Sequence, residues 1–195
     1  MVGSRWSTGA ADFFNMENKY QNYLELGPEA NKHTEGKERF SEDWSTMGLS
    51  DKNTSLDIEW DLNKYPYPLP DDCFEIVFSS HVLEHLDDPL ASLQEMYRIL
   101  KPGGLCRVNV PDARWYVSKY IDQGISLDDM TDTLRSFEPM KHKSPFDCLK
   151  VRRLLGEAGF SKGFIQRPYC SVLKLLKGKY FSSRDQKSVF GEGVK

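Results

Sequence analysis

Residues 69–104 constrain the fold of this chain more than any other stretch of its sequence. The run Phe74-Glu75-Ile76-Val77-Phe78 is rich in β-branched and aromatic residues and follows a turn signal, which is typical of a buried strand. Four apolar residues then recur at helical spacing: Leu90, Leu93, Tyr97 and Leu100. Asp87 or Asp88 can cap this helix, Pro89 suits its first position, and Pro102-Gly103-Gly104 predicts its end.

A further strand is expected at residues 105–110, which completes a strand–helix–strand unit. Such a unit implies a parallel sheet with a right-handed crossover. Ligands of parallel sheets bind at the carboxyl ends of the strands. Here that end is the polar segment Ser79-Ser80-His81-Val82-Leu83-Glu84-His85, which we therefore take as the candidate site.

The remaining sequence fits one α/β domain over residues 19–195, preceded by an arm at 1–18. Strands are expected at 23–26, 40–46, 55–60, 160–166 and 187–194, and helices at 112–124 and 147–158. Residues 28–39 are polar without an apolar period, so the first crossover helix should be short or missing. Residues 125–146 form a long polar connection, which we interpret as a substrate lid.

Composition excludes several classes of protein. The net charge of −3 and pI near 5.8 argue against a nucleic-acid-binding protein. No apolar run approaches the ~20 residues of a membrane span, and no signal peptide is evident at the amino terminus. The four cysteines are widely spaced, which predicts buried free thiols in a reducing, cytoplasmic environment and no metal site.

The central motif resembles that of class I S-adenosylmethionine-dependent methyltransferases, and within them the methyltransferase type 11 group. The matching residues are Asp72, Phe74, Glu75, Val77, Ser79, His81 to His85, Arg98, and Leu100 to Gly104. Arg107 to Asp112 and the carboxyl-terminal residues 184–195 resemble a small subgroup of that family. The resemblance covers roughly residues 21–195 and implies a Rossmann-like sheet of seven strands with the last one antiparallel.

The resemblance also implies S-adenosylmethionine as cofactor and a small-molecule or glycan-precursor acceptor. The residues that carry over as cofactor contacts are Glu25, Gly27, Asp61, Leu62, Ser79, Ser80 and His81. The ordinary alternatives are that Asp61 forms a turn, that Gly27-Pro28 is a plain turn, and that the serines satisfy loop backbone.

Two departures from the family pattern stand out. The first loop reads Leu26-Gly27-Pro28-Glu29, with one glycine where the family has two. The stretch Trp44 to Gly48 lacks the acidic residue that the family places after its second strand for the ribose hydroxyls. The alternative function is therefore a catalytically inactive methyltransferase-like binding or scaffold module with a degenerate cofactor loop.

Two histidines are the candidate catalytic residues. His81 and His85 both carry an imidazole that can accept a proton near neutral pH, so either could serve as the general base. The alternative is a packing or capping role at a helix entrance. Glu84 is expected to be structural, because a carboxylate is favourable near a helix amino terminus. Pro111, Asp112, Trp115 and His142 are candidates for the substrate side.

Overall fold

The computed structural model describes residues 22–28, 44–50, 56–124, 126, 128, 142–166, 170–171 and 188–195. Its seven strands form one sheet in the order β3-β2-β1-β4-β5-β7-β6. The strands are β1 (Tyr23–Leu26), β2 (Trp44–Gly48), β3 (Ile58–Glu59), β4 (Phe74–Ser80), β5 (Leu100–Pro111), β6 (Lys162–Gln166) and β7 (Ser188–Val194). The pairings between these strands are parallel except those of β7, which runs antiparallel to both β5 and β6. The predicted seven-stranded sheet with an antiparallel last strand is confirmed.

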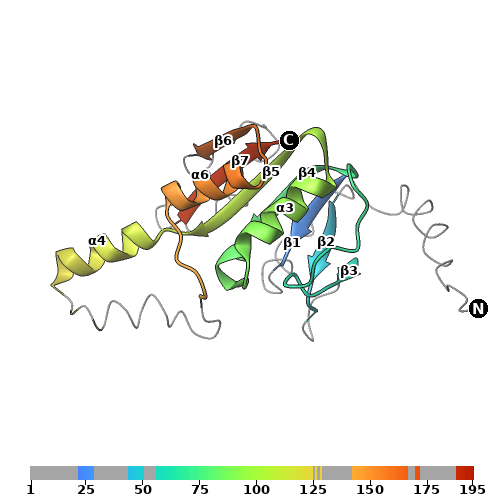
Figure 1. The fold of residues 1–195 in the computed structure, drawn as a ribbon. Coiled ribbons are helices and arrows are strands. Elements are labelled where there is room, and N and C mark those ends of the chain that lie inside the picture. Colours follow the sequence, from blue (N-terminus) through green and yellow to red (C-terminus); the bar gives the residue numbers. More distant parts are fainter. Residues whose placement is uncertain are drawn as a thin grey trace, which may run out of the picture.

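Three helices and one 3₁₀ turn accompany the sheet among the described residues. They are η1 (Leu83–His85), α3 (Pro89–Ile99), α4 (Ala113–Gln123) and α6 (Cys148–Glu157). The Asp88 side chain caps α3 by accepting from the backbone N–H groups of Leu90 and Ala91. Helices α3 and α6 lie on the same face of the sheet, whereas α4 extends away from it (Figure 1).

Several strand boundaries differ from those expected, and those of β2 and β5 have a clear cause in strand pairing. Strand β2 continues to Gly48, two residues beyond its expected end, because Met47 and Gly48 pair with β3. Strand β5 begins at Leu100 rather than 105, because Leu100 pairs with Phe74 and the register then shifts before Ile76. The glycine-rich stop therefore forms an irregular entrance to β5.

The core lies mainly between the sheet and α3 and α6. Its fully buried members include Leu24, Val77, Met96 and Leu155. A smaller cluster on the alternate side chains of the strands contains Trp44, Ile76, Phe78 and Leu105. Leu149 shares the apolar helical spacing that predicts a helix at 147–158, but in the first turn of α6 it is 62% exposed. The helix buries Val151 with Leu154 and Leu155 instead.

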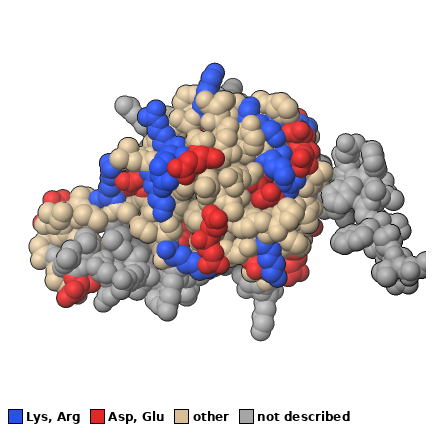
Figure 2. Space-filling view, in the orientation of Figure 1, with Lys and Arg blue, Asp and Glu red and all other residues tan. Residues whose placement is uncertain are grey.

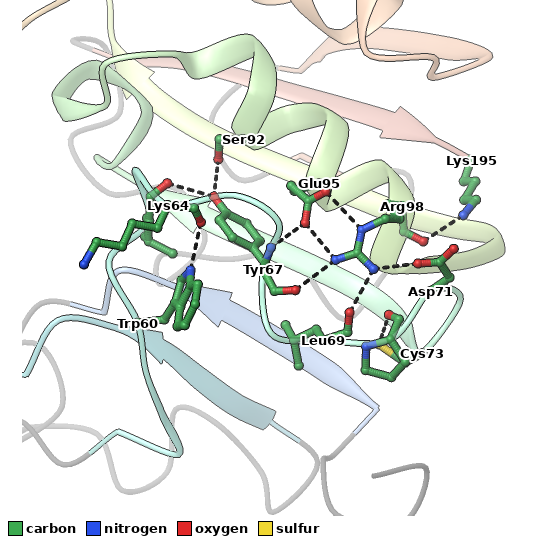
Figure 3. A network of polar contacts seen from close by, with 12 residues as sticks. Trp60, Lys64, Tyr67, Leu69, Asp71, Cys73, Ser92, Glu95, Arg98 and Lys195 are labelled. Atoms are coloured by element: carbon green, nitrogen blue, oxygen red, sulfur yellow. Dashed lines mark hydrogen bonds and ion pairs between the residues drawn. The ribbon is translucent and has the colours of Figure 1, made fainter. Parts of the chain in front are cut away.

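Arg98 of α3 fixes the connection between β3 and β4 (Figure 3). Its guanidinium donates to the backbone carbonyls of Tyr67 and Leu69 and to the carboxylates of Asp71 and Glu95. Glu95 also accepts from the Tyr67 backbone N–H at 2.6 Å. The Glu95 and Asp71 carboxylates raise the pKa of Arg98 above its usual range. This network holds the chain that leads from the end of β3 into β4.

The cysteines differ in burial, and the surface carries charges of both signs. Cys106 is buried as predicted, but the prediction is wrong for Cys170, which is exposed. Basic and acidic side chains are interspersed over the described residues on the face shown in Figure 2. Of the helices in the described part of the chain, none is long and apolar enough to span a membrane.

Several predictions fall on residues that the structure does not describe. These are the arm at 1–18, most of the 28–39 crossover and most of the 125–146 connection. The domain boundaries, the short first crossover and the lid therefore remain predictions.

Candidate functional site

The strand order reverses direction between β1 and β4. From β1 the chain adds β2 and β3 on one side, and β4 and β5 on the other. Leu26, the last residue of β1, lies opposite Ser79 of β4 and Met47 of β2. Ligands of open α/β sheets bind in the crevice outside the carboxyl ends of the strands at such a switch point. This switch point, beside Gly27 and Ser79, is therefore the candidate binding site.

Gly27 directly follows β1 at this edge. Its φ is +60°, a conformation that favours glycine. A Cβ built on it would lie 2.5 Å from Val82 Cγ2. Its N–H donates to the Met47 carbonyl at 2.8 Å, and Gly48 approaches Gly27 Cα closely enough that a Cβ there would lie 3.4 Å away. The backbone at the ends of β1 and β2 is therefore packed closely, and the Val82 side chain, just after β4, packs against Gly27.

The family carries an acidic residue after its second strand, whereas none of the described residues from Trp44 to Ser50 is acidic. The second strand ends at Gly48, which pairs with Glu59 of β3. Glu59 is exposed, and its carboxylate accepts from the Ser50 hydroxyl at 2.7 Å. A carboxylate and a hydroxyl therefore still lie beside this strand end, but on β3 and on the residues after β2.

Asp61 and Leu62 follow β3. Asp61 accepts from the Asn63 backbone N–H at 3.0 Å, which is the turn contact of the ordinary alternative. Asn63 in turn accepts from the Asp87 N–H at 2.8 Å, so this turn is tied to the start of α3. Leu62 is 7% exposed and belongs to the core cluster. Asp61 is half-buried, so its charged group is the more accessible of the two.

Glu25 lies two residues before Gly27 in β1. It is 5% exposed and pairs in register with Thr46 and Phe78. By strand alternation its side chain lies on the opposite face from Leu24 and Leu26, which face the α3 side. The Glu25 side chain therefore lies on the face of the sheet opposite to α3.

The turn after β4 gathers the most polar groups. His81 has a φ of +56°, and its N–H donates to the Asn109 carbonyl of β5 at 2.8 Å. The Asn109 amide donates to the Ser80 hydroxyl at 3.2 Å, so Ser80 helps to join β4 to β5. His81 Nδ1 lies 3.2 Å from Glu84 Oε1.

Three buried polar atoms of this turn have no hydrogen-bond partner among the described residues. They are Ser79 Oγ, His81 Nε2 and Glu84 Oε2. A buried polar group without a partner costs about 1–3 kcal/mol. Such groups, gathered at a switch point, are typical of a site that a ligand completes.

A segment distant in sequence returns to this turn. The backbone N–H groups of Lys143 and Ser144 donate to the Glu84 carbonyl at 2.8 and 3.2 Å. The rings of His85 and His142 meet edge to face, with centroids 4.8 Å apart. Phe146 then bridges to Asp112 just after β5. Of the four candidates for the substrate side, His142 is thus the one shown to contact His85.

A hollow of about 550 Å³ lies farther along, between α4 and the start of α6. Its lining is mainly apolar and includes Val117, Ile121 and Phe146 together with Lys150. None of the predicted cofactor or catalytic residues lines it. We therefore keep the strand-end edge as the candidate site, because the topology and the unpartnered polar atoms are there.

The predicted residues form two groups. The first lies around the ends of β1 and β4 and consists of Gly27, Ser79, Ser80, His81 and His85. The second consists of Glu25 and Leu62, which are buried, and of Asp61, which is linked to the start of α3 through Asn63 and Asp87. Sequence reasoning missed Asn109, which holds the turn, and the proximity of Glu84, His85 and His142. An asparagine between Val108 and Val110 in a buried strand was the available signal for Asn109.

A family model described as a methyltransferase domain matches residues 4–162. The chain belongs to this methyltransferase family. The predicted resemblance is thereby confirmed, and it agrees with the strand order and the polar turn after β4.

Curated relatives match over shorter spans. An uncharacterised methyltransferase of Schizosaccharomyces pombe is 52% identical over 40 residues, 20% of this chain and 14% of that protein. A ubiquinone/menaquinone biosynthesis C-methyltransferase of Xanthomonas campestris is 31% identical over 112 residues, 51% of this chain and 44% of that protein. The chain thus spans less than half the length of these relatives.

Solved structures share the fold. A structure from Thermotoga maritima, titled as an SAM-dependent methyltransferase and possible histamine N-methyltransferase, has a TM-score of 0.60 at 16% identity. The match covers 94% of this chain and 86% of that one. An SAM-dependent methyltransferase from Archaeoglobus fulgidus has a TM-score of 0.58 at 15% identity, with 95% and 90% covered.

Proposed function

We propose that this chain transfers a methyl group from S-adenosylmethionine to a small-molecule or glycan-precursor acceptor. Membership of the methyltransferase family supports the reaction, and the relatives named as SAM-dependent support the cofactor. The observation that carries the proposal is the switch point between β1 and β4, where Gly27 lies beside a turn with three unpartnered buried polar atoms.

The residues present fit a bound cofactor at this edge. The positive φ and close packing of Gly27 leave backbone rather than side chain at the end of β1, as a closely approaching ligand requires. Ser79 Oγ and His81 Nε2 offer hydrogen-bonding groups that the described residues do not use. We propose Glu25, Gly27, Asp61, Leu62, Ser79, Ser80 and His81 as the residues that hold the cofactor, with Leu62 and Glu25 acting through backbone and packing.

When bound, S-adenosylmethionine supplies a methyl group activated by a sulfonium. The protein's own part is to orient the acceptor, exclude water and accept a proton where the acceptor must lose one. We propose His85 or His81 as the group that accepts it. His85 is 21% exposed and His81 is 5% exposed at the side chain, so His85 is the more accessible to an acceptor.

Ligand binding tests the proposal directly. A thermal melt of the purified chain should shift upward with S-adenosylmethionine or with its demethylated product. At 100 times Kd the stabilisation is about 2.7 kcal/mol, which corresponds to roughly 5–10 °C for a chain of this size. No shift with either ligand at millimolar concentration would contradict the proposal and favour the inactive binding or scaffold module.

Substitution at Asp61 separates cofactor binding from the turn. Asp61→Asn retains a side-chain oxygen for the Asn63 N–H, whereas Asp61→Ala removes it. If the charged group contacts the cofactor, both variants should bind the demethylated product at least ~10-fold more weakly, since a hydrogen bond to a charged group contributes about 1.5–3 kcal/mol. Unchanged affinity in Asp61→Asn, with lost stability only in Asp61→Ala, would assign Asp61 to the turn alone.

The base is tested once an acceptor is found. Replacing the base by Ala should cost roughly 10²–10⁴-fold in kcat. Equal turnover in His81→Ala, His85→Ala and the unmodified chain would leave catalysis to positioning.

A further inference from the structure

Three metal-ligating side chains meet beside the turn after β4. Glu84 and His85 are neighbours in η1, and His142 comes from the returning segment. One ligand atom from each lies within 4.8 Å of the other two. Sequence reasoning predicted no metal site from the cysteine spacing alone, and this trio contains no cysteine.

Backbone hydrogen bonds hold the trio together. The Glu84 carbonyl accepts from both Lys143 and Ser144, the two residues that follow His142. The imidazoles of His85 and His142 consequently lie in edge contact, and His85 Nε2 is 3.9 Å from Glu84 Oε1. The arrangement therefore follows from the way the segment is anchored rather than from one adjustable rotamer.

The Glu84 carboxylate points to a ligand that the described residues do not supply. Glu84 is 1% exposed. Its Oε1 contacts His81 Nδ1 at 3.2 Å, while its Oε2 is buried without a hydrogen-bond partner among the described residues. A buried carboxylate with one oxygen unsatisfied is costly, and a cation is the group that satisfies it best. His81 contacts this carboxylate without being one of the three ligands, as outer partners of metal ligands do.

We propose that Glu84, His85 and His142 bind a divalent first-row transition-metal cation. Two imidazole nitrogens and one carboxylate oxygen suit zinc, iron, cobalt or nickel better than magnesium or calcium, which prefer oxygen ligands alone. Bonds of about 2.0–2.2 Å place such donors roughly 3–3.5 Å apart, so a span within 4.8 Å needs only small side-chain rotations. Three protein ligands leave positions open for water or another oxygen ligand.

The cation changes the part that the histidines can play in the proposed methyl transfer. A ring nitrogen of His85 bound to a metal cannot accept a proton at the same time. This consequence rests on the proposed function, whereas the cation site itself does not.

Metal titration of the full chain tests the site without cofactor or acceptor. After treatment with a chelator, isothermal titration with Zn²⁺ should give one site per chain with Kd below 10 μM, on the order expected for three protein ligands. Glu84→Gln and His142→Ala should each weaken binding by at least ~100-fold, since even outer partners contribute 10–100-fold. His81→Ala should weaken it by roughly 10–100-fold. Asp122→Asn, which removes an exposed carboxylate on α4, should leave affinity unchanged.

Two further measurements secure the interpretation. The visible spectrum of the Co²⁺ complex should lack thiolate-to-metal bands, which excludes binding through cysteines. Circular dichroism of each variant shows whether it is folded, and His142→Ala, at a half-buried position, guards against a folding defect in Glu84→Gln.

The outcomes separate the two proposals. No saturable Zn²⁺ binding, thiolate bands with Co²⁺, or equal affinity in His142→Ala and Asp122→Asn would overturn the cation site. Binding of S-adenosylmethionine would in each of those cases leave the proposed function standing. Tight Zn²⁺ binding lost in both ligand variants would support the site even if no methyl donor bound.

Discussion

Gly27→Ala should damage the fold and the candidate site more than the same substitution at the other described glycines with positive φ. An alanine with φ near +60° costs about 1–2 kcal/mol, because its Cβ crowds the following carbonyl. Its Cβ would also lie 2.5 Å from Val82 Cγ2, and relieving such overpacking costs a further 1–3 kcal/mol, roughly. The total of about 2–5 kcal/mol corresponds to a melting temperature lower by roughly 5–15 °C.

Gly124→Ala is the matched control. Gly124 has nearly the same φ, +65°, but among the described residues no atom lies within 4 Å of its added Cβ. This variant should therefore lose only about 1–2 kcal/mol, the conformational part. Urea unfolding at constant temperature measures both, and the cooperative slope should be unchanged.

A second substitution isolates the steric part. Val82→Ala removes the methyl group that the new Cβ would meet, so the double variant Gly27→Ala/Val82→Ala should be less destabilised than the sum of the single variants by about 1–3 kcal/mol. Affinity for the demethylated cofactor should fall in Gly27→Ala and be unaffected in Gly124→Ala. Equal destabilisation of the two single variants, or strict additivity in the double variant, would refute the close contact between the ends of β1 and β4.

Three further outcomes follow from other contacts. Arg98→Ala should cost roughly 2–4 kcal/mol, because two carbonyls and a half-buried carboxylate lose a charged donor, whereas Arg153→Ala on the exposed face of α6 should cost less than about 0.5 kcal/mol in the same urea titration. The backbone N–H of Lys150 lowers the pKa of Asp147, the cap of α6. The contribution of Asp147 to the free energy of unfolding is therefore present above its unfolded-state pKa and is lost as pH falls through its folded-state pKa. Asp147→Asn should reduce the loss of stability at acid pH, and an unchanged loss would refute this. Cys170 should react first with a thiol reagent in the native chain, and Cys106, whose pKa burial raises, should react only on unfolding; early labelling of Cys106 would contradict its burial.

The local parts of the fold could be read from the sequence because their signals are local. The cap at Asp88, the apolar stripe of α3 and the β-branched run of β4 each depend on residues a few positions apart. Strand ends were less certain, since pairing with β3 extends β2 and pairing with β4 draws β5 back to Leu100. Exposure of Leu149 was invisible for a similar reason: only the packing of α6 decides which face of the helix is buried.

The candidate site divides in the same way. Ser79, His81 and His85 were identified because they follow a strand whose carboxyl end must face the ligand edge of a parallel sheet. The Asn63–Asp87 bond that joins Asp61 to the start of α3 was not foreseeable, because it links two loops 24 residues apart.

His142 shows what decides the remaining chemistry of this edge. Its place beside His85 depends on two backbone hydrogen bonds to the Glu84 carbonyl, and backbone groups carry no signature in the sequence. Those bonds bring a second imidazole to a carboxylate that η1 has already buried, while the positive φ of His81 turns its own imidazole toward the same carboxylate. A buried carboxylate surrounded by three imidazoles either shares their protons or binds a cation. Zn²⁺ titration of His142→Ala decides between the two, because a proton network built on His81 and Glu84 would survive that substitution and a metal site would not.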